Sequence, residues 1–132
     1  MKSLIRIEHS DGQGLFGRYT MDEDGGISRD SIVARNVPDL QYLFNRHQDF
    51  NAPSEEPFAD EFIQGKHFCA YKSLQQLNNW ILPEEMSIIL SIGYKVYLID
   101  VSEYLEGEHQ ICYRKSHILN KKDISSIFKT TS

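Results

Sequence analysis

The stretch FCAYKSLQQLNNWI, residues 68–81, constrains the fold most, because it joins a strand pattern to a helix pattern without a loop. HFCAYK (67–72) is a short apolar and aromatic run typical of a strand. Ser73 then stands where a helix N-cap belongs, and Gln76 completes a capping-box pattern. Apolar residues recur at helical spacing after it, at Leu74, Leu77, Trp80 and Ile81. The sequence therefore predicts a strand that leads directly into a helix.

Two further helices are predicted. Pro83 breaks the first helical pattern and begins a second one, which runs to Ile92 with Gly93 as its C-cap. Residues 37–49 also show apolar residues on one helical face, with Asn36 in the N-cap position.

Alternating apolar and polar residues predict the remaining strands. SLIRIEH (3–9) and YKVYLIDV (94–101) alternate clearly, and EGEHQICYRKS (106–116) is a third such segment. Residues 117–128 fit either a strand through Leu119 or a short helix, and we favour the strand. The spacing between 94–101 and 108–116 predicts an antiparallel hairpin pair. Together these segments predict an α+β fold with a small, mostly antiparallel sheet or sheets and two to three helices.

Two segments lack a regular pattern. Residues 10–36 are rich in glycine and acidic residues, and residues 49–67 carry two prolines and five acids, with a short helix possible at 59–63. Irregular segments of this length often carry function, so specificity is expected to reside there.

The chain has 132 residues, which fits a single domain spanning 1–132. Its two cysteines, Cys69 and Cys112, lie in apolar runs and form neither a disulfide framework nor a zinc-ligand spacing, so we predict buried free thiols and no metal site. No apolar stretch reaches membrane-spanning length, and the first residues lack a signal-peptide pattern. These features favour a cytoplasmic protein.

Charge is unevenly distributed along the chain. The net charge is -5, yet residues 114–132 hold five basic side chains and one acidic one. Residues 1–113 therefore hold 9 basic and 18 acidic side chains, a net of -9. Such a negative body disfavours nonspecific binding of nucleic acid. It suits a protein that occupies a basic groove on a protein partner, but a solvated surface without a partner is the simpler explanation, since a net charge of this size is common in small domains.

Candidate site residues lie on or beside the predicted strands. Arg6 stands in the middle of the first strand, where it either faces solvent or meets an anion or a carboxylate such as Glu8 on the same face. His9 follows at the end of that strand, as a surface residue or a ligand contact.

Further candidates lie later in the chain. Ser73 caps a helix whose free N–H groups can hold an anion, and Tyr71 before it is either a core aromatic or a platform for a planar ring. Glu106, Glu108 and Gln110 are expected on one face of the late strand, as a charged edge or as ligands of ribose hydroxyls.

The order of these residues resembles the small ADP-ribosyltransferase-like fold. The segment GKHFCAYKSLQQLNNWI followed by YKVYLIDV looks like the central strand–helix–strand unit of that family. The resemblance implies NAD as the ligand, with Arg6 or His9 holding ribose or phosphate, Tyr71 stacking on nicotinamide and Ser73 opening the helix beside it. Only Ser73 stands where the family has a Ser-Thr-Ser triplet.

In the same resemblance, Glu108 or Gln110 takes the catalytic position and stabilises a ribosyl cation. The implied activity is transfer of ADP-ribose to a protein or nucleic acid. LIRIEHSDGQG together with FCAYKSLQQLNNWI also looks like a group of small phage proteins. The alternative function is therefore a small acidic, phage-encoded inhibitor that blocks a host or defence protein by surface contact.

Overall fold

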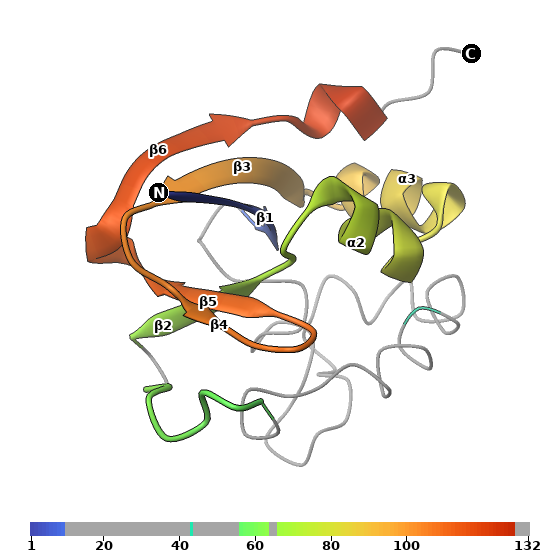
Figure 1. Cartoon of the computed structure of the whole chain (residues 1–132). Helices are drawn as coiled ribbons and strands as arrows, with labels where there is room; N and C mark the ends of the chain where they lie inside the picture. The colour runs from blue at the N-terminus through green and yellow to red at the C-terminus, as the bar shows by residue number, and fades with distance from the viewer. Residues whose placement is uncertain (10–42, 44–55, 64–65, 129–132) are drawn as a thin grey trace.

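The computed structural model describes residues 1–9, 43, 56–63 and 66–128. The strands in this part of the chain form two three-stranded antiparallel sheets, which lie one above the other in Figure 1 with the helices at one end. The elements are β1 (Lys2–Glu8), β2 (His67–Ala70), α2 (Leu74–Trp80), α3 (Pro83–Ser91), β3 (Lys95–Val101), β4 (Leu105–Glu106), β5 (Ile111–Arg114), the 3-10 helix η3 (Lys115–His117), β6 (Ile118–Asp123) and the 3-10 helix η4 (Ser125–Phe128).

The first sheet has the order β1-β3-β6. β3 lies in the centre, with Lys2 opposite Val101 and Glu8 opposite Lys95 along its pairing with β1. β1 is buried from Leu4 to Glu8, so both of its faces pack against protein. The second sheet has the order β2-β5-β4.

Among the described residues, one isolated backbone bridge connects the two sheets. Ile5 of β1 and Tyr71 after β2 exchange two hydrogen bonds, of 2.9 and 2.7 Å between nitrogen and oxygen. The chain that leaves β2 therefore touches the first sheet at one position before it enters α2.

Alternation along β1 divides its apolar side chains between two cores. Ile5 and Ile7 pack with residues of α2, α3 and β3 in the first core, whose buried members include Leu77, Met86, Ile89, Tyr94 and Val96. Leu4 points to the second core, between the two sheets, with Ala70, Ile99, Val101, Ile111 and Tyr113.

The predicted helix ends of α2 and α3 are confirmed. The Ser73 hydroxyl accepts the N–H of Gln76 at 3.1 Å, as an N-cap does. Pro83 occupies the first turn of α3, and the chain leaves that helix through Gly93 at a φ of 104°, a left-handed conformation that favours glycine.

The predicted hairpin between 94–101 and 108–116 is wrong. β3 pairs with β1 and β6, and β5 pairs with β2 and β4. The chain reverses inside the segment predicted as one strand, where the N–H of Gly107 donates to the carbonyl of Gln110 at 2.8 Å. Glu106, Glu108 and Gln110 therefore surround a turn and do not share one strand face.

The strand predicted through Leu119 extends to Asp123, because residues 120–123 continue the pairing with β3 beyond an irregularity at Leu119, although most side chains of β6 are exposed. The short helix predicted at 59–63 is a turn, in which the N–H of Phe62 donates to the carbonyl of Phe58 at 3.2 Å. The predictions for 10–36 and 37–49 lie outside the described residues, except that Leu43 is helical and buried.

Candidate functional site

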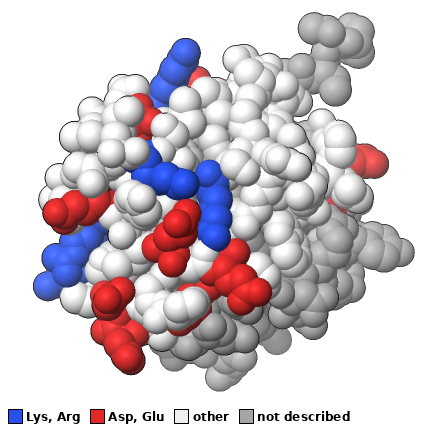
Figure 2. Space-filling view, viewed as in Figure 1, with Lys and Arg blue, Asp and Glu red and all other residues white. Residues whose placement is uncertain are grey.

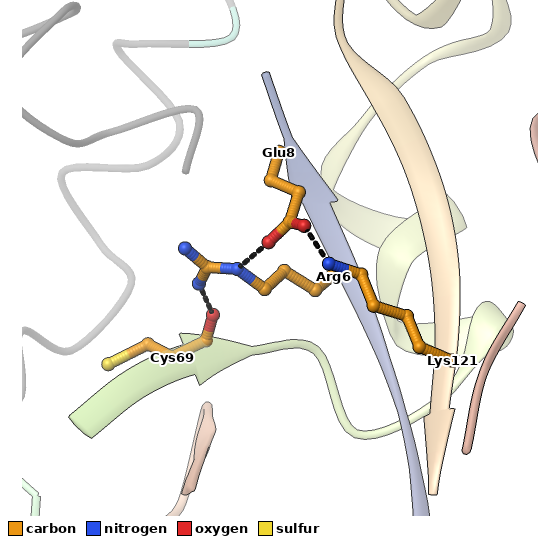
Figure 3. Close-up of polar contacts among 4 residues, drawn as sticks. All are labelled: Arg6, Glu8, Cys69 and Lys121. Atoms are coloured by element: carbon orange, nitrogen blue, oxygen red, sulfur yellow. Dashed lines mark hydrogen bonds and ion pairs between the residues drawn. The ribbon is translucent and has the colours of Figure 1, made fainter. Parts of the chain in front are cut away.

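Arg6 and Glu8 form a buried ion pair, and the partly exposed Lys121 also contacts Glu8, as Figure 3 shows. Its side chain is 7% exposed, and its Nε donates to Glu8 Oε2 at 2.8 Å. Lys121 reaches the other oxygen of Glu8 from β6 and passes over the ring of Tyr97 on β3, 4.4 Å from its centroid. Of the two alternatives for Arg6, contact with solvent or with a carboxylate, the structure shows the carboxylate of Glu8.

The Arg6 guanidinium also belongs to the second sheet. Its Nη1 donates to the carbonyl of Cys69 at 2.6 Å, and its Cζ lies 5.1 Å from the ring centroid of Phe68. Because these contacts connect β1 with β2, Arg6 stabilises the junction of the sheets.

Tyr71 packs in the first core and is 8% exposed. Burial raises the pKa of its hydroxyl well above the ordinary value. His9 lies at the far end of β1, where its ring meets the edge of Tyr94 at 5.2 Å between centroids. A Cβ at Gly93 would stand 2.9 Å from its Nε2. Tyr71 is thus a core aromatic, and His9 packs at the end of α3.

Ser73 lies near the late hairpin. The Gln76 side chain accepts the N–H of Lys72 at 2.7 Å and donates to the carbonyl of His109 at 2.6 Å. The rings of Trp80 and His109 meet edge to face at 6.0 Å. These contacts dock the hairpin turn against α2, and they bring the start of that helix close to residues 108–110.

Glu56 is a buried carboxylate that holds this turn, and it is 3% exposed. The successive N–H groups of Glu108, His109 and Gln110 all donate to it, the last two at 2.8 and 3.2 Å. A Cβ on Gly107 would overlap the Glu56 carboxylate, and it would stand 2.7 Å from Phe58 Cε2. Glycine at 107 is therefore required for the close approach.

The turn separates the two predicted catalytic residues. Glu108 is exposed at its tip, whereas Gln110 is 5% exposed and enters β5. The structure thus attaches the helix that Ser73 caps to the turn of Glu108 and Gln110 through the contacts of His109, and it places Arg6, His9 and Tyr71 in separate packed environments.

A cavity of about 720 Å³ adjoins the second sheet. Charged and aromatic groups line it, among them Glu61, His67, Glu103, Tyr104, Arg114 and His117, together with Cys112. His67 and Arg114 are directly opposite in the β2–β5 register, and the pair Cys69 and Cys112 lies two positions along the same strands. Because side chains two residues apart share a sheet face, all four project from one face.

The surroundings of His67 in this cavity favour its neutral form. Its Nδ1 accepts the N–H of Ile63 at 3.0 Å, which leaves the ring proton of the neutral form on Nε2. Burial and, next, the positive charge of Arg114 lower the pKa of His67. Across the cavity, His117 Nε2 lies 3.1 Å from the exposed Glu103 carboxylate.

Residues 1–126 match the model of a family described as Bacteriophage T4 Y00F protein. The chain belongs to this family. The predicted likeness to small phage proteins is thereby confirmed. No curated protein and no solved structure matches the chain. Across the described ranges of this phage protein, none of the helices is long and apolar enough to span a bilayer.

Sequence reasoning missed Glu56, Lys121 and the Cys69–Cys112 pairing. Glu56 lies in an acidic segment that reads as solvated, and nothing in the pattern separates it from its neighbours. Pairing of the cysteines follows from the β2–β5 register, which the wrong hairpin prediction concealed.

Proposed function

We propose that this phage protein acts by binding a protein of the infected cell through an acidic surface. The observation that carries the proposal is the bonding of Glu56 to three successive N–H groups of the hairpin turn. These hydrogen bonds attach segment 56–63 to the hairpin turn. The acidic side chains of the two segments are therefore held near each other.

We call Glu61, Glu103 and Glu108 the acidic rim. All three are exposed, and Glu61 and Glu103 line the same cavity. Figure 2 shows acidic side chains gathered in the lower part of the described surface. Within the described chain, Glu61 and Glu108 make no ion pair, whereas Glu103 meets His117 and the nearby Glu106 meets Lys2 at 3.4 Å.

Two physical effects favour such a surface as a binding site. Unneutralised carboxylates speed the approach of a basic partner and disfavour acidic ones. A turn already fixed by buried hydrogen bonds loses little conformational entropy when it binds. A basic groove is the complementary surface, and membership of a phage family supports a target in the infected cell.

Charge reversal tests the proposal. The tagged protein, its Glu61→Lys/Glu108→Lys variant and a Glu84→Lys/Ser87→Lys/Ser91→Lys variant on α3 are used to capture proteins from host lysate, because both variants change the net charge by about +4. Glu84 is an exposed acid on α3, away from the rim. We expect a partner that the native protein and the α3 variant both retain, that the rim variant loses, and that raised salt releases. Equal capture by all three proteins overturns the proposal.

A second candidate is the NAD-binding, ADP-ribosyltransferase-like function. The bond between Gln76 and His109 supports it, because it attaches the first turn of α2, which Ser73 caps, to the hairpin turn that carries Glu108. NAD should then raise the melting temperature of the native protein by mass action, and much less so in Glu108→Ala. An equal melting temperature with and without millimolar NAD rules out this candidate and leaves the acidic rim untouched.

A further inference from the structure

We propose that Cys69 and Cys112 form a dithiol site that a hydroperoxide converts into a disulfide between β2 and β5. This inference is independent of the acidic rim. The two residues are the only cysteines of the chain, and both are free thiols.

Register places the two cysteines together. Cys69 and Cys112 are direct partners in the antiparallel β2–β5 pair. Directly opposite residues have Cα atoms roughly 4.5–5.5 Å apart, inside the range that a disulfide spans. The backbone therefore needs no rearrangement for the bond to form.

The sulfur atoms already lie in close contact. Their Sγ atoms are 2.8 Å apart, closer than the roughly 3.5–4.0 Å at which carbon atoms pack. Because both side chains point to the same face of the sheet, the remaining approach is a small rotation about each Cα–Cβ bond.

The two thiols differ in access, which sets the order of the reaction. Cys69 is half-buried and Cys112 is fully buried. Contact with the Cys69 sulfur and, next, burial raise the pKa of Cys112, so this residue stays a thiol. Cys69 is therefore the residue that meets an oxidant first.

The steps balance with hydrogen peroxide as the oxidant. The Cys69 sulfur attacks one peroxide oxygen, the O–O bond breaks, and a sulfenic acid and water form. The Cys112 sulfur then attacks the Cys69 sulfur, the S–O bond breaks, and a second water leaves with the Cys112 proton. Two thiols lose two electrons and two protons in total, and the peroxide gains them.

The bond would close a loop of the chain that contains α2, α3, β3 and β4. Closing a loop of this length restricts the unfolded chain, which favours the folded state. We expect the melting temperature to rise by roughly 10 °C on oxidation.

The test treats the full chain with a small excess of hydrogen peroxide and sets part of the sample aside for melting. The rest is unfolded in urea, because Cys112 is buried, and its remaining thiols are blocked with iodoacetamide before the intact mass is recorded. We expect a monomer lighter by two hydrogens, with no alkylation, which dithiothreitol restores to a doubly alkylated form. The higher melting temperature should appear in the same sample.

Single Cys69→Ser and Cys112→Ser variants and the double variant serve as controls. We expect all three to lack the mass loss and the peroxide-dependent rise in melting temperature, and the Cys112→Ser variant to accumulate the Cys69 sulfenic acid. A native protein that keeps two alkylatable thiols, or that forms only disulfide-linked dimers, overturns the proposal. The double variant should melt close to the temperature of the reduced native protein. This result shows that the variant still folds and that it lacks the response to peroxide only because it lacks the thiols.

Discussion

Arg6 on β1 donates a hydrogen bond of 2.6 Å to the carbonyl of Cys69 on β2, across the boundary between the two sheets. The same guanidinium holds the Glu8 carboxylate, which also binds Lys121 of β6. Arg6 is thus a buried cation with partners in both sheets, and replacing it should lower the stability of both.

Replacing Arg6 by methionine should destabilise the protein by about 3–5 kcal/mol. The substitution keeps most of the apolar contact but leaves the Glu8 carboxylate largely buried with one partner fewer, and it leaves the Cys69 carbonyl without the Arg6 donor. Urea unfolding of the native protein and the variant measures the change. Lys122→Ala, at an exposed position of β6, is the control and should change stability by less than about 0.5 kcal/mol.

The double variant Arg6→Met/Glu8→Leu separates charge burial from packing. A buried pair replaced together by apolar side chains often costs little, and Lys121 is exposed enough to rehydrate, with 37% of its side chain accessible. We expect the double variant to recover most of the lost stability. A double variant less stable than Arg6→Met contradicts this account.

Replacing Glu56 by alanine should free the turn at 108–110. Three N–H groups lose their acceptor, and we expect a loss of about 2–3 kcal/mol. Hydrogen exchange of the amides of 108, 109 and 110 is the direct readout and should accelerate more than exchange in α3. Glu84→Ala is the matched control on an exposed carboxylate. Unchanged exchange at the turn shows that Glu56 does not hold it.

Stability should fall as the pH falls below about 6.5, in part through His67. The pKa of His67 is lower in the folded chain than its ordinary value of 6.5, so the unfolded chain binds the proton more readily. Its contribution is therefore fully present above 6.5 and is lost as the pH falls through the folded pKa.

The check is the urea midpoint of native protein and His67→Gln between about pH 5 and pH 8. The variant should show a shallower loss below 6.5, because glutamine does not titrate. Parallel pH profiles for the two proteins refute a role for His67. Arg114→Gln should shift the profile in the same direction as His67→Gln, since it removes a charge that disfavours protonation.

Local signals were sufficient to predict the helices and the main strands. Ser73, Pro83 and Gly93 act through their own backbone and neighbours, so their roles are visible in a short window of sequence. The alternation of apolar and polar residues in 94–101 likewise indicates a half-buried strand, regardless of which strands pair with it.

Strand pairing and the site could not be predicted in the same way. The break between β4 and β5 depends on Glu56, about fifty positions earlier, binding the backbone of 108–110. The sequence around Tyr71 is compatible both with a platform that stacks on a ligand ring and with a core position. Its backbone bridge to Ile5 places it in the core, and this contact is not visible in the sequence. Contacts between residues that are far apart in the chain produce no periodic pattern in the sequence.

The pairing of β1 has a consequence for how the chain acquires its structure. β1 spans residues near the start of the chain, yet its ladder partner is β3, which ends at Val101, and β3 in turn pairs with β6. During synthesis the ladder of β1 cannot form until residues 95–101 have been made. Closing so distant a contact is slow, because the entropy of a long loop is lost before the ladder forms. Isoleucines of the first strand stay exposed in the meantime, and exposed apolar side chains make an incompletely folded chain prone to aggregate.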